Sequence, residues 1–246
     1  MPIRTITFDW GDTLATNHGQ PYGYQHRRAL GVLAQALTAC GGAPGADWLE
    51  RCHDELHAAW TESVDPVQNP EHREFDMATM IADWARAAGA DPDSPCVAAA
   101  LTELADSCIG LVLAYDGVEA VLSELKQRGY RIGILSHVAW PGDCCRRWFA
   151  TRGWDRLFDF YSFSSDVGWI KPNQRHYDHA CAEAGCGPDQ ILHVGDHPER
   201  DITAAAAYGF QTCLRMTEGI YAGERITACK PDYTVVHIRE MLEFLR

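Results

Sequence analysis

Four short segments of this 246-residue chain carry side chains that suit phosphoryl transfer. An aspartate can attack phosphorus, a serine hydroxyl can bond a phosphoryl oxygen, and a lysine can neutralise the charge that develops. Two further carboxylates can hold a hard metal ion that prefers oxygen ligands. In chain order the residues are Asp9, then Ser136 with His137, then Lys171, and finally Asp196 with Asp201. Together they indicate metal-assisted transfer of a phosphoryl group.

Each segment follows a stretch that is predicted to be a buried strand. These stretches are rich in apolar and β-branched residues and lie at 3–8, 131–135, 158–164 and 191–194. Helical patterns separate them, and strands that alternate with helices form a parallel, doubly wound α/β sheet. Because such a sheet places the carboxyl ends of its strands at one edge, the four segments are expected to meet there.

Between the first and second strands lies a purely helical insert. Four helical patterns, at 24–40, 46–62, 71–88 and 94–114, are separated by glycine and proline breakers, with no β-rich run between them. Apolar residues share one face of these helices, so the helices can pack into a small bundle. We therefore expect a core domain of residues 1–15 and 115–246 and a helical domain of residues 16–114.

The four segments also resemble a known family. Phe8-Asp9 followed by Thr13-Leu14 is similar to the first motif of the haloacid dehalogenase-like (HAD) hydrolases, and the other segments follow in the family's order. The insert lies where the family's type-1 cap domain lies. The resemblance implies a Rossmann-like core with an inserted helical cap. It also implies a Mg²⁺-dependent hydrolase that removes phosphate from a small phosphorylated metabolite through an aspartyl-phosphate intermediate.

The resemblance assigns a role to each carboxylate. It implies that Asp9 is the nucleophile and that Mg²⁺ is held by Asp9, the backbone carbonyl of Gly11 and Asp196. It further implies supporting roles for Asp201 and Thr13. Asp201 would orient Lys171 or a water on the metal. A metal ion matters most in the transition state, where charge spreads over the transferring phosphoryl oxygens.

The resemblance also implies that Ser136, His137 and Lys171 bind the phosphate and that Lys171 neutralises its developing charge. The family often has asparagine at position 137. A histidine there can donate to the substrate or carry a proton near neutral pH, and it can equally be a packed side chain. Both interpretations of His137 stay open.

The first motif departs from the family pattern at the general acid. Family phosphatases usually carry a second aspartate two residues after the nucleophile, and here that position is Gly11. Asp12 lies one residue later, and a shift of one residue at a strand tip changes the direction of the side chain. Asp12 can replace the acid if the loop turns it inward, or it can cap the turn.

Two other functions fit parts of the pattern. Haloacid dehalogenases also lack the second aspartate, so a 2-haloacid dehalogenase-type hydrolase is one alternative. Dehalogenases need no metal, however, whereas Asp196 with Asp201 resembles the Mg²⁺-dependent version of the fourth motif. The other alternative is a non-catalytic protein that binds a phosphate ligand or another protein, which Gly11 would allow.

Composition limits the partners. The net charge of −13 disfavours nucleic acid and anionic membranes. Met1 leads directly into the first strand and no apolar run approaches the length of a membrane span, so a cytoplasmic location is expected. The ten cysteines form no Cys-x-x-Cys motif and are expected to be buried small hydrophobes.

The insert is expected to contribute the side chains that select the substrate. The candidates are Tyr22, Tyr24, His26 and Arg27.

Overall fold

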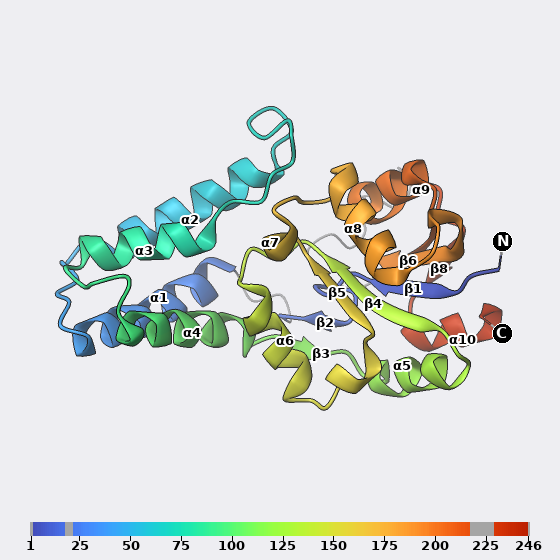
Figure 1. The fold of residues 1–246 in the computed structure, drawn as a ribbon, viewed down its shortest axis with the longest axis horizontal. Coiled ribbons are helices and arrows are strands. Elements are labelled where there is room, and N and C mark those ends of the chain that lie inside the picture. Colours follow the sequence, from blue (N-terminus) through green and yellow to red (C-terminus); the bar gives the residue numbers. More distant parts are fainter. Residues whose placement is uncertain (1, 18–21, 217–228, 246) are drawn as a thin grey trace.

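The computed structural model describes residues 2–17, 22–216 and 229–245, and Figure 1 shows them as a central sheet with helices around it. Six parallel strands form the sheet in the order β5-β4-β1-β6-β7-β8. This confirms the predicted doubly wound α/β fold. The strands are β1 (Thr5–Phe8), β4 (Arg131–Ser136), β5 (Phe160–Phe163), β6 (Ile191–Gly195), β7 (Gln211–Arg215) and β8 (Tyr233–Val235).

Strand β1 lies in the middle of the sheet, between β4 and β6. All four of its residues are buried, as expected for a strand that is covered on both faces. Phe8 pairs with Ile134 on one side and with Val194 on the other. Because the three strands run in parallel, β1, β4 and β6 end at the same edge of the sheet, and Asp9, His137 and Asp196 follow them there.

Helices cover both faces of the sheet. Ile134 packs into one hydrophobic cluster, with residues of α5 and α6, whereas the next residue, Leu135, packs into another, with residues of α8 and α9. Successive strand residues point to opposite faces, so the two clusters are the two sides of the sheet. The helices are α5 (Val118–Gln127), α6 (Gly142–Ala150), α7 (Ser164–Val167), α8 (Gln174–Ala184), α9 (Ala204–Tyr208) and α10 (Met241–Phe244), with a π-helical turn at Pro198–Thr203.

The insert forms a bundle that lies to one side of the sheet in Figure 1. Its helices pack around a hydrophobic cluster of their own, to which Leu33, Trp48 and Trp84 belong. The indole of Trp48 also donates a hydrogen bond to the Trp84 carbonyl at 3.0 Å. The helices are α1 (Tyr22–Ala39), α2 (Trp48–Val64), α3 (Met77–Ala87) and α4 (Pro95–Ile109).

Two short strands that the sequence did not predict connect the bundle to the sheet. Strands β2 (Ala15–Thr16) and β3 (Leu113–Ala114) pair antiparallel, with Ala15 opposite Ala114. The helix predicted over 94–114 therefore ends at Ile109. A strand of two residues has no detectable periodicity, and its hydrogen-bond partner is about a hundred residues away.

The helix predicted over 71–88 is also shorter than expected. It begins at Met77, after Asp76, whose carboxylate accepts a hydrogen bond from the Thr79 amide at 3.0 Å. Such an N-cap is a local signal that marks the first residue of a helix. Residues 71–75 are not helical, because the Glu74 amide and the carbonyls of Glu71 and His72 bond the sheet domain instead.

The cysteine prediction was partly wrong. Cys40, after α1, forms a disulfide with Cys96, in the first turn of α4. The other eight cysteines are free thiols, and five of them are buried as expected. Within the described residues, no helix is both long enough and apolar enough to cross a membrane.

Candidate active site

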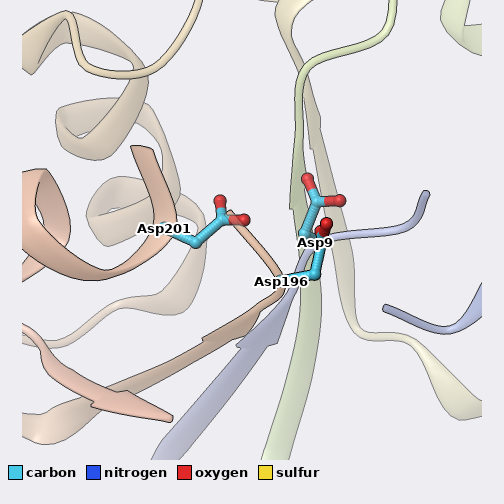
Figure 2. Close-up of side chains that lie close together, drawn as sticks. All are labelled: Asp9, Asp196 and Asp201. Atoms are coloured by element: carbon cyan, nitrogen blue, oxygen red, sulfur yellow. The ribbon is translucent and has the colours of Figure 1, made fainter. Parts of the chain in front are cut away.

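Three carboxylates converge at the carboxyl edge of the sheet (Figure 2). Asp9 follows β1, Asp196 follows β6, and Asp201 lies in the π-helical turn. Each offers a carboxylate oxygen, and the three oxygens lie within 4.8 Å of one another. Oxygen ligands at this spacing suit a hard divalent cation such as Mg²⁺.

Lys171 joins two of these carboxylates. Its ammonium donates to Asp9 Oδ1 at 2.8 Å, to Asp201 Oδ1 at 2.5 Å and to the Leu135 carbonyl at 2.9 Å. The side chain is buried. Burial alone would lower the pKa of Lys171, but Asp201 and Asp9 raise it above its ordinary value. The lysine is therefore a permanent cation beside Asp9.

The surroundings of the three carboxylates shift their pKa values in different directions. Burial and then the charge of Asp201 raise the pKa of Asp9, against the effect of Lys171. Burial and the neighbouring Asp201, Asp9 and Asp12 raise the pKa of Asp196 well above its usual range. For Asp201, Lys171 and His193 overcome burial and hold the pKa well below that range. The protein thus compensates the negative charge of Asp9 and Asp196 less completely than that of Asp201.

Neighbouring side chains fix the positions of the carboxylates. The Thr13 hydroxyl donates to Asp196 Oδ1 at 3.3 Å. Asp201 uses both oxygens within the protein, because His193 Nε2 lies 3.2 Å from Oδ1 and the His197 amide donates to Oδ2 at 3.0 Å. Asp9 and Asp196 therefore fit a metal ion better than Asp201 does.

Asp12 lies in the turn that follows Asp9. Its amide donates to the Ala15 carbonyl at 2.6 Å, and its φ of 52° is in the left-handed region. Aspartate tolerates this conformation better than most residues do. The residue is buried and, with Gly11, lines the same cavity as Asp9 and Lys171. The loop thus brings Asp12 to the cavity instead of leaving it on the outer surface.

The two residues of the second segment have different surroundings. Ser136 is buried, and its hydroxyl accepts a hydrogen bond from the Trp10 amide at 3.4 Å, so it supports the turn that carries Asp9. His137 lines the cavity. Its ring stacks on Trp60 of α2, with 4.8 Å between the ring centroids, and its Nε2 lies 3.2 Å from the Glu74 carboxylate. Residues of the insert therefore hold His137 in place.

These side chains surround a cavity of about 90 Å³. Trp60, His197 and Arg200 line it, and none of them was predicted. Arg200 immediately precedes Asp201 in the fourth segment, and this position could have predicted that it lies at the cavity. Nothing in the sequence around Trp60 predicts that it does. The described residues that line the cavity are Asp9, Gly11, Asp12, Trp60, His137, Lys171, Asp196, His197, Arg200 and Asp201.

The insert residues proposed to select substrate do not contribute to the described lining. Tyr24 is exposed, Arg27 pairs with Glu50 at 3.1 Å, and His26 contacts the ring of Trp140. The side chain of Tyr22 lies outside the described residues. Among the described lining residues only Trp60 comes from the insert.

A parallel doubly wound sheet, a helical insert after its first strand, and an aspartate and lysine paired at the carboxyl edge together define a HAD-like hydrolase. A sequence model described as haloacid dehalogenase-like hydrolase matches residues 3–209. The chain belongs to this family, as the motif resemblance implied, and it is a hydrolase.

Relatives named as phosphatases align with the chain. A glyceraldehyde 3-phosphate phosphatase of Methanopyrus kandleri is 27% identical over 248 residues, which cover 99% of this chain and 97% of that protein. A phosphoserine phosphatase of Thermus thermophilus is 30% identical over 127 residues, which cover 52% of this chain and 49% of that protein.

Solved structures share the fold. A HAD phosphatase from Thermococcus onnurineus has a TM-score of 0.66 at 18% identity, over 99% of this chain and 98% of that one. A 2-haloacid dehalogenase from Pseudomonas syringae pv. Tomato has a TM-score of 0.65 at 21% identity, over the same shares. Since both activities occur on this fold, the fold alone does not distinguish phosphatase from dehalogenase.

Proposed function

We propose that the protein is a Mg²⁺-dependent phosphatase that acts on a small phosphorylated metabolite through an aspartyl-phosphate intermediate. The observation that carries the proposal is the pairing of Asp9 with the buried Lys171 at 2.8 Å, in a cavity that also contains Asp196. Support comes from the phosphatase name of a relative that aligns over nearly the whole chain. Residues 16–114 would be the cap over this site.

In the first step Asp9 attacks the substrate. Lys171 holds one carboxylate oxygen of Asp9, and the other oxygen forms a bond to phosphorus while the bond from phosphorus to the leaving alcohol oxygen breaks. Lys171 neutralises charge on the phosphoryl oxygens. Asp12 gives its proton to the leaving alcohol, which departs neutral.

In the second step the aspartyl-phosphate is hydrolysed. A water molecule attacks phosphorus, its proton passes to Asp12, and the bond between phosphorus and Asp9 breaks. Inorganic phosphate and the Asp9 carboxylate are the products, so both aspartates return to their starting forms. Ser136 and His137 would support the phosphate, with Ser136 also holding the turn of Asp9.

The metal site fits this chemistry. Mg²⁺ would be held by Asp9, Asp196 and the carbonyl of Gly11, where the protein compensates the negative charge of the carboxylates only in part. When bound, the ion neutralises negative charge on the nucleophile and the phosphoryl group. Thr13 and Asp201 would keep Asp196 and Lys171 in position.

A substrate panel tests the function. Alkyl phosphates and an activated aryl phosphate are assayed with Mg²⁺ and with chelator, and a 2-haloacid is assayed in parallel. We expect Mg²⁺-dependent phosphate release that Asp9→Asn abolishes. Metal-independent halide release would instead favour the dehalogenase, and binding of phosphate esters without turnover would favour the non-catalytic alternative.

A further inference from the structure

A short stretch of the insert docks on the loop that carries Lys171. This docking segment, Glu71–Phe75, belongs to the connection between α2 and α3, which lies beside the connection between α7 and α8 in Figure 1. The Glu74 amide donates to the Gly168 carbonyl at 3.1 Å, and the Ile170 amide donates to the His72 carbonyl at 2.8 Å. Two segments far apart in sequence thus form a β-bridge directly before Lys171.

Side chains hold the loop on the other side of Lys171 as well. The side-chain Nδ2 of Asn173 donates to the Glu71 carbonyl at 2.6 Å. The Arg73 guanidinium lies 4.3 Å from the centre of the Trp169 ring, a cation–π contact. The lysine loop is therefore attached to the insert both before and after Lys171.

Glu74 anchors the docking segment. Its carboxylate is 2% exposed, accepts a hydrogen bond from the Ser164 hydroxyl at 2.5 Å, and lies 3.2 Å from His137 Nε2. A buried carboxylate is costly unless it keeps its partners. Because Ser164 and His137 both belong to the sheet domain, the segment is favoured in the position where Glu74 accepts the Ser164 hydrogen bond and lies beside His137.

The same contact shapes the cavity wall. His137 is held between the Glu74 carboxylate at its edge and the Trp60 ring on its face. Both residues come from the insert, whereas Lys171 and His137 belong to the sheet domain. The position of the insert is thus coupled to two residues of the site.

We propose that Glu74 is a positioning residue, which docks segment Glu71–Phe75 so that Lys171 and His137 are held in their reactive positions. The proposal rests on the phosphatase function for its kinetic consequence. Lys171 acts on charge that develops in the transition state, so misplacing it lowers kcat more than it raises KM.

Kinetics of matched variants test this role. We expect Glu74→Ala to lower kcat by about 10- to 100-fold with little change in KM, since small displacements of catalytic groups cost this much. Glu74→Gln keeps an acceptor for Ser164 and is expected to recover most of the loss. The control is Asp83→Asn in α3, whose exposed side chain pairs with Arg86 at 2.6 Å outside the docking segment, and which should retain wild-type kinetics. Equal losses in Glu74→Ala and Glu74→Gln, or a wild-type kcat in both, would overturn the role.

Hydrogen exchange tests docking without any activity. Glu74→Ala should speed exchange of the Ile170 amide, which donates to the docking segment, and leave the β6 amides protected. Arg73→Ala, a change at an exposed side chain, should give a smaller effect in the same direction. Unchanged exchange at Ile170 in Glu74→Ala would contradict the proposal. If the wild type hydrolysed no phosphate ester, the proposed function would fail and this measurement would still decide the docking.

Discussion

Asp9, Asp196 and Asp201 are the same kind of side chain, and their neighbours give them different pKa values. Burial raises the pKa of Asp9 and Asp196, and adjacent carboxylates add to the effect at both. Lys171 and His193 reverse the effect of burial at Asp201. The environment therefore divides the three into a pair suited to bind a cation and one that holds the lysine.

This division has a consequence for stability. With no metal bound, burial and the neighbouring carboxylates oppose ionisation of Asp196, so Asp196→Asn should raise the free energy of unfolding by about 0.5–2 kcal/mol at pH 7. The variant should also lose the stabilisation that Mg²⁺ gives the wild type. Thermal denaturation with Mg²⁺ and with chelator measures both effects.

The difference in unfolding free energy between Asp196→Asn and the metal-free wild type depends on pH. The folded-state pKa of Asp196 is raised well above 3.8, so the residue is neutral in both folded and unfolded wild type below that pH. The advantage of the asparagine should be absent below the unfolded-state pKa, grow as pH rises from there to the raised folded-state pKa, and stay constant above it. An Asp196→Asn variant that is less stable than metal-free wild type at neutral pH would contradict this electrostatic interpretation.

The role of Asp12 depends on the leaving group. We expect Asp12→Asn to slow hydrolysis of an alkyl phosphate by about 10²–10⁴-fold and to slow that of an activated aryl phosphate much less, because only the poor leaving group needs a proton. Asparagine is preferred to alanine since it tolerates the φ of 52° at this position. Equal slowing of both substrates would show that Asp12 supports the turn and is not the acid.

At the scale of elements, the site depends on contacts that no local pattern reveals. The bounds of α8 follow from local signals, because the Asn173 side chain caps its start and Gly185, in the left-handed region, ends it. Residues 71–76 were predicted as helix, yet their hydrogen bonds go to Gly168 and Ile170 of a distant loop. Trp60 likewise enters the site only because α2 packs where it does.

The disulfide belongs to this scale as well, because it ties the end of α1 to the start of α4. It closes a loop with a sequence separation of 56 residues. We expect the Cys40→Ser, Cys96→Ser double variant to lose about 2–4 kcal/mol of unfolding free energy relative to the oxidised protein. Urea denaturation with and without reductant measures the loss, and reductant should leave the double variant unchanged.

A count of free thiols connects the disulfide to the expected cytoplasmic location. Ten cysteines with one disulfide leave eight free thiols in the oxidised protein. Protein trapped directly from cells with an alkylating reagent should expose all ten if the compartment is reducing. Eight modified cysteines would instead show that the disulfide forms there, which would contradict a cytoplasmic location.

At the scale of the whole molecule, the proposed function requires a strongly acidic protein to bind an anionic substrate. The net charge is −13, while Lys171 and Arg200 supply positive charge at the cavity. Added salt screens the long-range repulsion, so kcat/KM should rise by about twofold between low and physiological ionic strength when Mg²⁺ is held constant. A fall in kcat/KM would indicate that local attraction dominates the encounter.

Much of the architecture could be predicted from the sequence, for a physical reason. The buried strands are short apolar runs and their order fixes the edge at which Asp9, Ser136, Lys171 and Asp196 emerge. The direction of Asp12 could not be predicted, because it depends on a left-handed residue within one turn. Arg200 could have been assigned from its place in the fourth segment, whereas Trp60 could not be assigned to the cavity without knowing how the insert lies on the sheet.

The most direct test of the proposed function is to detect a phosphoryl group on Asp9. Enzyme mixed with Mg²⁺ and a phosphate ester is quenched in acid during turnover, digested and analysed by mass spectrometry. We expect a phosphorylated peptide that contains Asp9 in the wild type and no phosphorylated peptide in Asp9→Asn. A wild-type enzyme that releases phosphate while Asp9 stays unmodified, or that carries the phosphoryl group on another residue, would contradict the mechanism.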